Sequence, residues 1–167
     1  MMQASKFTPI IIATAIMTII SVFPFLNLIN VLCCAGVIAG GFAGAAFYAK
    51  QLRKSGNMIL FKDGAMIGLL SGLVSALLVV FFTTLITIIS SHNPVPDIYK
   101  MFDTYGYPLP PEAEKMLKQI SDEYNKSGFS ITITLVNLAV YIIAYPVFGA
   151  LGGIIASTVY GKRKVTE

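Results

Sequence analysis

The sequence predicts an all-α integral membrane protein with four transmembrane helices arranged as two hairpins, and a short amphipathic-helical external segment. Of the 167 residues, 56% are hydrophobic and 12% are charged, whereas soluble domains average about 25% charged residues. So few charges could not cover the polar surface of a soluble core of this size. Residues 7–49 contain no charge and are too long for a single span, which needs about 20 apolar residues.

The first hairpin is expected to contain spans at residues 8–23 and 28–49. Pro24 lacks a backbone donor, so the chain should reverse there, with Asn27 and Asn30 in the turn. A secretory signal peptide is the alternative for the first span. We disfavour it because no small-residue cleavage site precedes Pro24 and the apolar character continues.

Polar and sulfur-bearing side chains within this hairpin are interpreted as structural. The hydroxyls of Thr14, Thr18 and Ser21 are expected to bond mainly to carbonyl groups of their own helix. Cys33 and Cys34 are adjacent on an apolar helix and cannot form an ordinary disulfide with each other. We interpret both cysteines as small hydrophobic residues.

The second hairpin is expected to contain spans at residues 64–90 and 129–160. Pro94 follows the third span and stops it. The fourth span ends at Gly161, before a basic cluster at residues 162–164. Pro146 lies near the middle of the fourth span, where it should free a carbonyl group and kink the helix.

Close helix packing is predicted where small residues recur every four positions, because this spacing places them on one helix face and lets backbones approach. Ile38, on another face, is expected to contact lipid. Asn137 should hydrogen-bond to the neighbouring span near Thr83 and Thr84, contributing about 0.6 kcal/mol to packing. The predicted packing residues are Gly36, Gly40, Gly44, Gly64, Gly68, Gly72, Gly149, Gly153 and Asn137.

Residues 93–128 form the one sizeable water-exposed segment and predict two short amphipathic helices. Ile98, Met101, Phe102 and Tyr105 follow helical spacing in the first helix, and the second begins at Pro111. Both helices need an apolar surface. They are expected either to cap the bundle end or bilayer interface, or to form a docking surface for a partner.

Catalysis is not expected, because the sequence lacks paired carboxylates, a zinc-protease motif, a phosphate-binding loop and a nucleophile with a plausible base. No cofactor or metal is predicted. Asp63 is interpreted as a carboxylate that satisfies free amides in the first turn of a helix. His92, the one histidine, is interpreted as interfacial. Nucleic acid is not an expected partner, because the basic residues flank apolar runs as membrane topology requires.

Three segments give the chain a resemblance to a bacterial family of small four-span membrane proteins known as domain of unknown function 4199. They are the basic loop leading into Phe61-Lys62-Asp63-Gly64-Ala65, the charged segment before the last span, and Tyr145-Pro146-Val147-Phe148-Gly149 through the terminal Gly161-Lys162-Arg163-Lys164. The resemblance implies a four-span fold and brings no known activity.

Two functions are compatible with these features. The first is a structural or accessory membrane subunit that packs with itself, as a homo-oligomer, or with a larger membrane complex through small-residue faces. The alternative is a small-molecule or lipid transporter or channel, favoured by the expected bend at Pro146 and the glycine-rich interior. In either case the lipid bilayer is a partner.

Counting lysine and arginine residues predicts that both termini lie in the cytoplasm, in the bacterial inner membrane, because positive residues concentrate in cytoplasmic loops. Cysteines introduced at Ser55 and Ser127 should therefore react oppositely with an impermeant reagent. Labelling of position 55 alone in intact spheroplasts would contradict this topology. The eight residues on the inner side are Lys6, Lys50, Arg53, Lys54, Lys62, Lys162, Arg163 and Lys164, against Lys100, Lys115, Lys118 and Lys126 outside.

Overall fold

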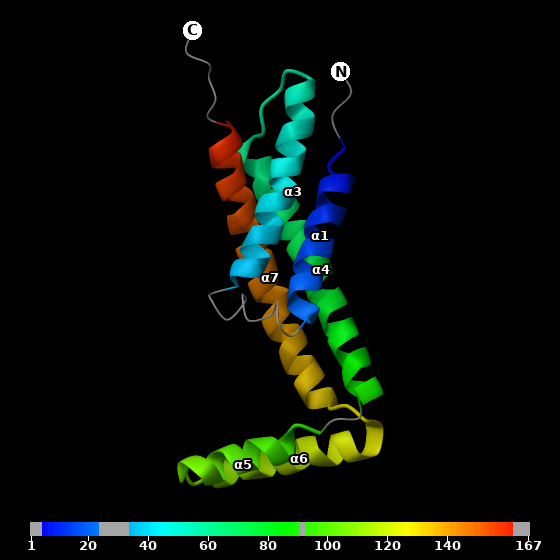
Figure 1. The fold of residues 1–167 in the computed structure, drawn as a ribbon, viewed down its shortest axis with the longest axis vertical. Helices are drawn as coiled ribbons and strands as arrows, with labels where there is room; N and C mark the ends of the chain where they lie inside the picture. The colour runs from blue at the N-terminus through cyan, green and yellow to red at the C-terminus, as the bar shows by residue number, and fades with distance from the viewer. Residues whose placement is uncertain (1–4, 24–33, 91–92, 162–167) are drawn as a thin grey trace. The chain divides into compact units, whose positions relative to one another are not determined.

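A computed structural model of the chain describes residues 5–23, 34–90 and 93–161, which form helices and no strands, so the all-α prediction is confirmed. The predicted turn at Pro24, Asn27 and Asn30, Cys33, the start of the second span, His92 and the basic cluster at 162–164 lie outside the described residues. The helices are α1 (Phe7–Val22), α3 (Ala35–Lys54), α4 (Phe61–Ser90), α5 (Val95–Tyr105), α6 (Pro111–Ser127) and α7 (Ile131–Gly161), as labelled in Figure 1.

Among the described residues, α4 and α7 are the two helices long and apolar enough to cross a membrane. They contain 30 and 31 residues, and only 28% and 22% of the residues in their most apolar stretches are buried. The core helix of a soluble protein would be mostly buried. Helix α1 is apolar but has only 16 residues, so four spans are not confirmed by helix length.

The chain divides into two compact units. The first contains residues 1–79 and 139–167, and the second contains residues 80–138. Helices α4 and α7 each contribute one part to the first unit and one part to the second.

In the first unit, α4 and α7 are antiparallel and touch backbone to backbone. A Cβ atom on Gly64 would meet the carbonyl oxygen of Gly153, and one on Gly68 would meet that of Gly149. One turn further along α4, a Cβ on Gly72 would meet the carbonyl oxygen of Tyr145. Each step of four residues along α4 thus matches a step of four residues back along α7, and every contact needs a residue without a side chain.

Helix α3 packs against α7 in the same manner. A Cβ atom on Gly41 would meet the carbonyl oxygen of Gly149, and one on Gly152 would meet that of Ile38. Ile38 is half-buried, and the contact of its side chain with lipid stays a prediction. Its backbone forms part of the α3–α7 contact.

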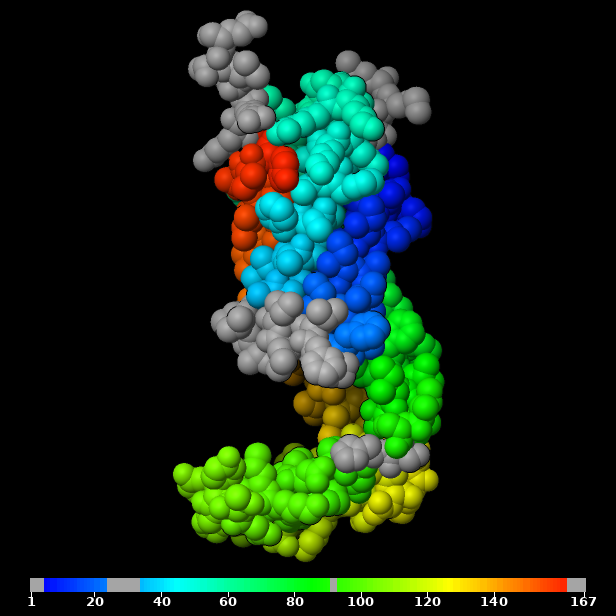
Figure 2. Space-filling model, viewed as in Figure 1, coloured from blue at the N-terminus to red at the C-terminus, as the bar shows by residue number. Residues whose placement is uncertain are grey.

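Helices α1 and α3 lie side by side, and no groove separates them on the face shown in Figure 2. Gly40 lies against the Met17 side chain, and a Cβ on Gly44 would stand 2.6 Å from the Cβ of Ala13. Gly36 is also buried in α3.

Hydroxyl groups join α1 to α4. The Ser71 hydroxyl shares its one proton between the carbonyl oxygens of Ile67 in its own helix, at 2.5 Å, and of Ile10 in α1, at 3.3 Å. The Ser75 hydroxyl donates to the carbonyl oxygen of Thr14 at 3.2 Å. Thr14 donates across to the carbonyl oxygen of Ser71 at 3.5 Å. The expectation that Thr14 would bond within its own helix is therefore wrong, because α4 approaches closely enough to offer a carbonyl group.

Large apolar side chains point outward from the first unit. Exposed fractions range from 37% to 53% along one stripe on α4 and another on α7. A soluble protein would bury such continuous stripes. Helix contacts made by small residues, with large apolar residues on the outer faces, are the arrangement expected of helices solvated by lipid. The stripes are Leu69, Leu73 and Leu77 on α4, and Val147, Leu151 and Ile155 on α7.

The second unit consists of the α5–α6 hairpin with the last turns of α4 and the first turns of α7. The two amphipathic helices occupy the segment where the sequence predicts them, and Gly106 ends α5 with a φ of 66° that favours glycine. Asn93 fastens the hairpin, because its amide nitrogen donates to Ser121 at 3.1 Å while its oxygen accepts from the Val95 amide at 3.0 Å. Within this unit the hairpin lies crosswise to the last turns of α4 and the first turns of α7 (Figure 1).

The α4–α7 contact predicts that Gly68→Ala destabilises the protein. The added Cβ would meet the backbone of Gly149, which cannot rotate away as a side chain can, and overpacking of this kind costs about 1–3 kcal/mol. Alanine is favoured over glycine in a helix by about 1 kcal/mol. If the site were open, the substitution would therefore raise the stability of the protein. We expect a lower thermal midpoint in detergent.

Ala39→Leu is the matched control, because Ala39 is exposed on α3 and the substitution adds a larger volume without meeting a backbone. Its thermal midpoint should stay close to that of the wild type. A midpoint for Gly68→Ala at or above the wild-type value would contradict the close contact.

Candidate functional site

An ion pair joins the start of α1 to the start of α4. The Lys6 ammonium nitrogen lies 2.7 Å from an Asp63 carboxylate oxygen, and the two side chains are 31% and 15% exposed. Asp63 stands in the first turn of α4, as the sequence predicts. Sequence reasoning missed its partner, since no local pattern pairs residues separated by 57 positions. The carboxylate is engaged in a structural contact.

Arg53, near the end of α3, holds the end of α7. Its guanidinium donates to the carbonyl oxygen of Tyr160 at 3.4 Å and lies 5.4 Å from the centre of the Tyr160 ring. A cation at the carboxyl end of a helix satisfies an unpaired carbonyl and complements the helix dipole. Together with the Lys6–Asp63 pair, this contact places basic residues at one end of the first unit.

A cavity of about 120 Å³ lies between α4 and α7 in the second unit. It brings Asn137 together with Thr83 and Thr84, at the matching depth predicted from the sequence. Thr83 and Thr87 donate to carbonyl oxygens of their own helix, and the hydrogen bond from Asn137 to a threonine stays a prediction. The cavity is lined by Thr83, Thr84, Thr87, Tyr124, Phe129, Ser130, Ile133, Thr134 and Asn137.

Glu123 of α6 accepts hydrogen bonds from residues at the start of α7, beside this cavity. Its carboxylate accepts hydrogen bonds from the Ser130 hydroxyl at 2.5 Å, the Thr132 hydroxyl at 2.7 Å and the Thr132 amide at 3.0 Å. These bonds, led by the one from Ser130, lower the pKa of Glu123 to about 2. Sequence reasoning missed this role, although Ser130 before an apolar run is a typical helix N-cap, and it does accept from the Ile133 amide at 3.2 Å.

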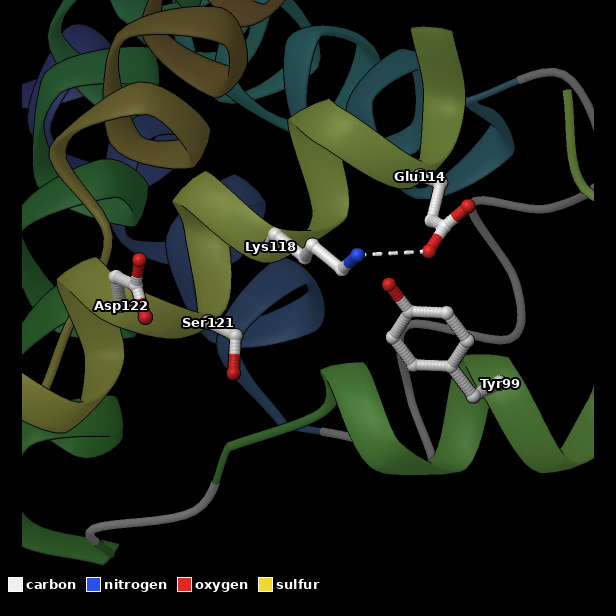
Figure 3. Close-up of a pocket in the computed structure, with 5 residues that line it drawn as sticks. All are labelled: Tyr99, Glu114, Lys118, Ser121 and Asp122. Carbon is white, nitrogen blue, oxygen red and sulfur yellow. Dashed lines mark ion pairs between the residues drawn. The ribbon is translucent and has the colours of Figure 1, made fainter. Parts of the chain in front are cut away.

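A groove of about 410 Å³ separates α5 from α6 (Figure 3). Lys118 and Glu114 form an ion pair of 2.8 Å across one turn of α6, which lowers the pKa of Glu114 and raises that of Lys118. The Tyr99 hydroxyl points from α5 toward this pair and is buried without a hydrogen-bond partner in the described part of the chain. The groove is lined by Tyr99, Glu114, Lys118, Ser121 and Asp122.

Two further features were considered as functional, the proline in α7 and a possible metal site. Pro146 lies inside α7, which continues as one helix from Ile131 to Gly161, and the predicted kink stays a prediction. Within the residues described, no three His, Cys, Asp or Glu side chains gather closely enough to hold a metal ion.

No protein-family model, curated protein or solved structure matches this chain. The resemblance to domain of unknown function 4199 therefore stays a prediction from the sequence.

The contacts of Glu123 predict that Glu123→Ala loosens the start of α7 and lowers the thermal midpoint in detergent at neutral pH. A carboxylate with a depressed pKa stabilises the fold fully above its unfolded pKa of about 4.5, and the contribution fades as the pH falls toward 2. The difference in midpoint between wild type and variant should therefore shrink between these two values.

Asp103→Ala is the control, since Asp103 is an exposed carboxylate on α5. It should change the midpoint little at any pH in this range. A Glu123→Ala difference that stays constant from pH 7 to pH 2 would contradict the role of the ionised carboxylate.

Proposed function

We propose that this chain is a four-span protein of the bacterial inner membrane, related to the family of domain of unknown function 4199, with a structural or accessory role. The single observation that carries the proposal is the arrangement of the first unit, where glycine backbones touch inside and large apolar side chains point outward. Such a bundle suits lipid as its solvent and needs no chemistry of its own.

The positions of α1 and α3 support four spans despite their modest length. Helix α1 follows α4 from the Lys6–Asp63 pair to the bond between Ser75 and Thr14. Helix α3 follows α7 from the Gly152–Ile38 contact to the bond between Arg53 and Tyr160. If α4 and α7 cross the bilayer, the shorter helices beside them lie within it as well, and a short span is accommodated by local thinning of the bilayer.

The distribution of charge supports the proposed orientation. The end of the first unit that contains Lys6, Arg53 and Lys62 would face the cytoplasm, where positive residues concentrate. The opposite sign dominates residues 93–128, which would face outward. Of the eight acidic residues in the chain, six lie in that segment: Asp97, Asp103, Glu112, Glu114, Asp122 and Glu123.

The α5–α6 hairpin is the proposed contact surface for a second copy or a larger complex. The sequence favoured the glycine stripes for this role, but the glycines already contact backbones within the chain. The hairpin instead exposes large side chains in an otherwise charged segment, and aromatic and methionine residues are enriched at protein interfaces. These side chains are Met101 at 52% exposure, Tyr105 at 70%, Tyr107 at 69% and Met116 at 59%.

A small-molecule or lipid transporter or channel is the second candidate, and the polar cavity beside Asn137 is the observation that favours it. Against it stands the closure of the first unit at Gly41, Gly68 and Gly152, where backbone lies against backbone. Proton coupling has little support, because Asp63 is paired with Lys6 and an asparagine cannot change its charge.

The accessory role predicts two results. Purified protein in liposomes should neither dissipate an imposed pH gradient nor take up solutes in response to one. Proton-coupled uptake that Asp63→Asn abolishes, in a protein that is otherwise folded, would overturn the accessory role.

The second result concerns the hairpin. A photo-crosslinking residue at Met116 should capture a second copy or another membrane protein in native membranes, whereas the same residue at Leu73 should react with lipid. Protein crosslinks at Leu73 and none at Met116 would show that the bundle surface, and not the hairpin, makes the contact.

A further inference from the structure

Three threonines that line the cavity between α4 and α7 present oxygen lone pairs to it and have no proton left to donate. The hydroxyl protons of Thr83, Thr87 and Thr134 are directed to the carbonyl oxygens of Val80, Thr83 and Ser130, at 3.1, 2.9 and 2.8 Å. A hydroxyl has one proton and two lone pairs. Once its proton is committed to the helix backbone, it can offer a neighbour only its oxygen as an acceptor.

Three amides at the start of α7 are already engaged, although helix N-termini commonly bind anions. The Thr132 amide donates to Glu123, the Ile133 amide to the Ser130 hydroxyl oxygen, and the Thr134 amide to the Ser130 carbonyl oxygen. The Ser130 hydroxyl proton is also taken by Glu123. These donors are therefore not available to an anion.

The charge around the cavity favours a positive occupant. Within the described ranges no lysine or arginine lines it, and the ionised Glu123 accepts a hydrogen bond from Ser130. The Glu123 carboxylate accepts hydrogen bonds from Ser130 and Thr132 and is not itself among the described residues that line the cavity. Calcium sites are usually built from carboxylates in direct contact, and a lining of neutral oxygens alone suits a single positive charge better than a double one.

We propose that this cavity binds a small monovalent cation, an alkali ion or ammonium, through the oxygens of Thr83, Thr87, Thr134 and Asn137. The volume of about 120 Å³ corresponds to about four water molecules at about 30 Å³ each. The cation therefore keeps part of its hydration shell. This site is independent of the accessory role, since binding requires no passage across the membrane.

The test uses the full chain in detergent with N-methylglucammonium chloride as the reference salt, replaced at constant ionic strength by sodium, potassium or ammonium chloride. At least one of the three cations should raise the thermal midpoint in a saturable manner. For sodium, equilibrium dialysis with ²²Na⁺ measures binding directly. No saturable response to any of the three would mean that the cavity holds water only, and would overturn the proposal.

Thr134→Val removes one cavity oxygen at nearly constant volume and should weaken the response at least tenfold. Thr158→Val is the matched control, because Thr158 also lies on α7 and makes the same type of bond, to the carbonyl oxygen of Ile154 at 3.0 Å, without lining the cavity. Asn137→Asp adds a negative charge and should tighten binding. An equal loss in the Thr134 and Thr158 variants, or weaker binding by a folded Asn137→Asp protein, would overturn the proposal.

Discussion

The carbonyl oxygen of Gly149 occupies the space that a Cβ on Gly41 would need, and the same residue lies against Gly68 of α4. A Cβ on Gly149 itself would stand 3.2 Å from the terminal methyl carbon of Met17 in α1. Four helices therefore meet at one residue that has no side chain. Any larger residue there would push at least two backbones apart, and the hydroxyl contacts between α1 and α4 require that the backbones remain close.

This constraint explains the composition of the interior. Lipid solvates leucine as well as another helix does, so helix association in a bilayer depends on close packing and on hydrogen bonds. The first unit uses both: glycine and alanine allow the approach, and Ser71 and Ser75 reach carbonyl groups on the neighbouring helix. Many of its large apolar side chains lie on the outer faces.

The sequence predicted what depends on local spacing. Helix type, the approximate bounds of α4 to α7, and the glycine-rich faces follow from periodicity and from proline and glycine positions. The sequence could not predict which helix faces contact each other, because a four-residue spacing identifies a packing face but not the helix that packs against it. The Lys6–Asp63 pair depends on α1 running alongside α4, and the Glu123 contacts depend on how α6 ends. Both contacts join residues that come together only when the chain folds.

The proposed cation site follows from the change of residue type along α4 and α7. Within the first unit their contact is made by glycines, which bring backbones together and leave no space. Within the second unit the facing residues are threonines and Asn137, whose branched or longer side chains line a cavity. A threonine in a helix satisfies its own proton by bonding to the preceding turn, as Thr83, Thr87 and Thr134 do. These threonines therefore present acceptor oxygens to the cavity. A bound cation, or a water molecule that the cation carries, would supply the positive charge or the proton that these oxygens accept.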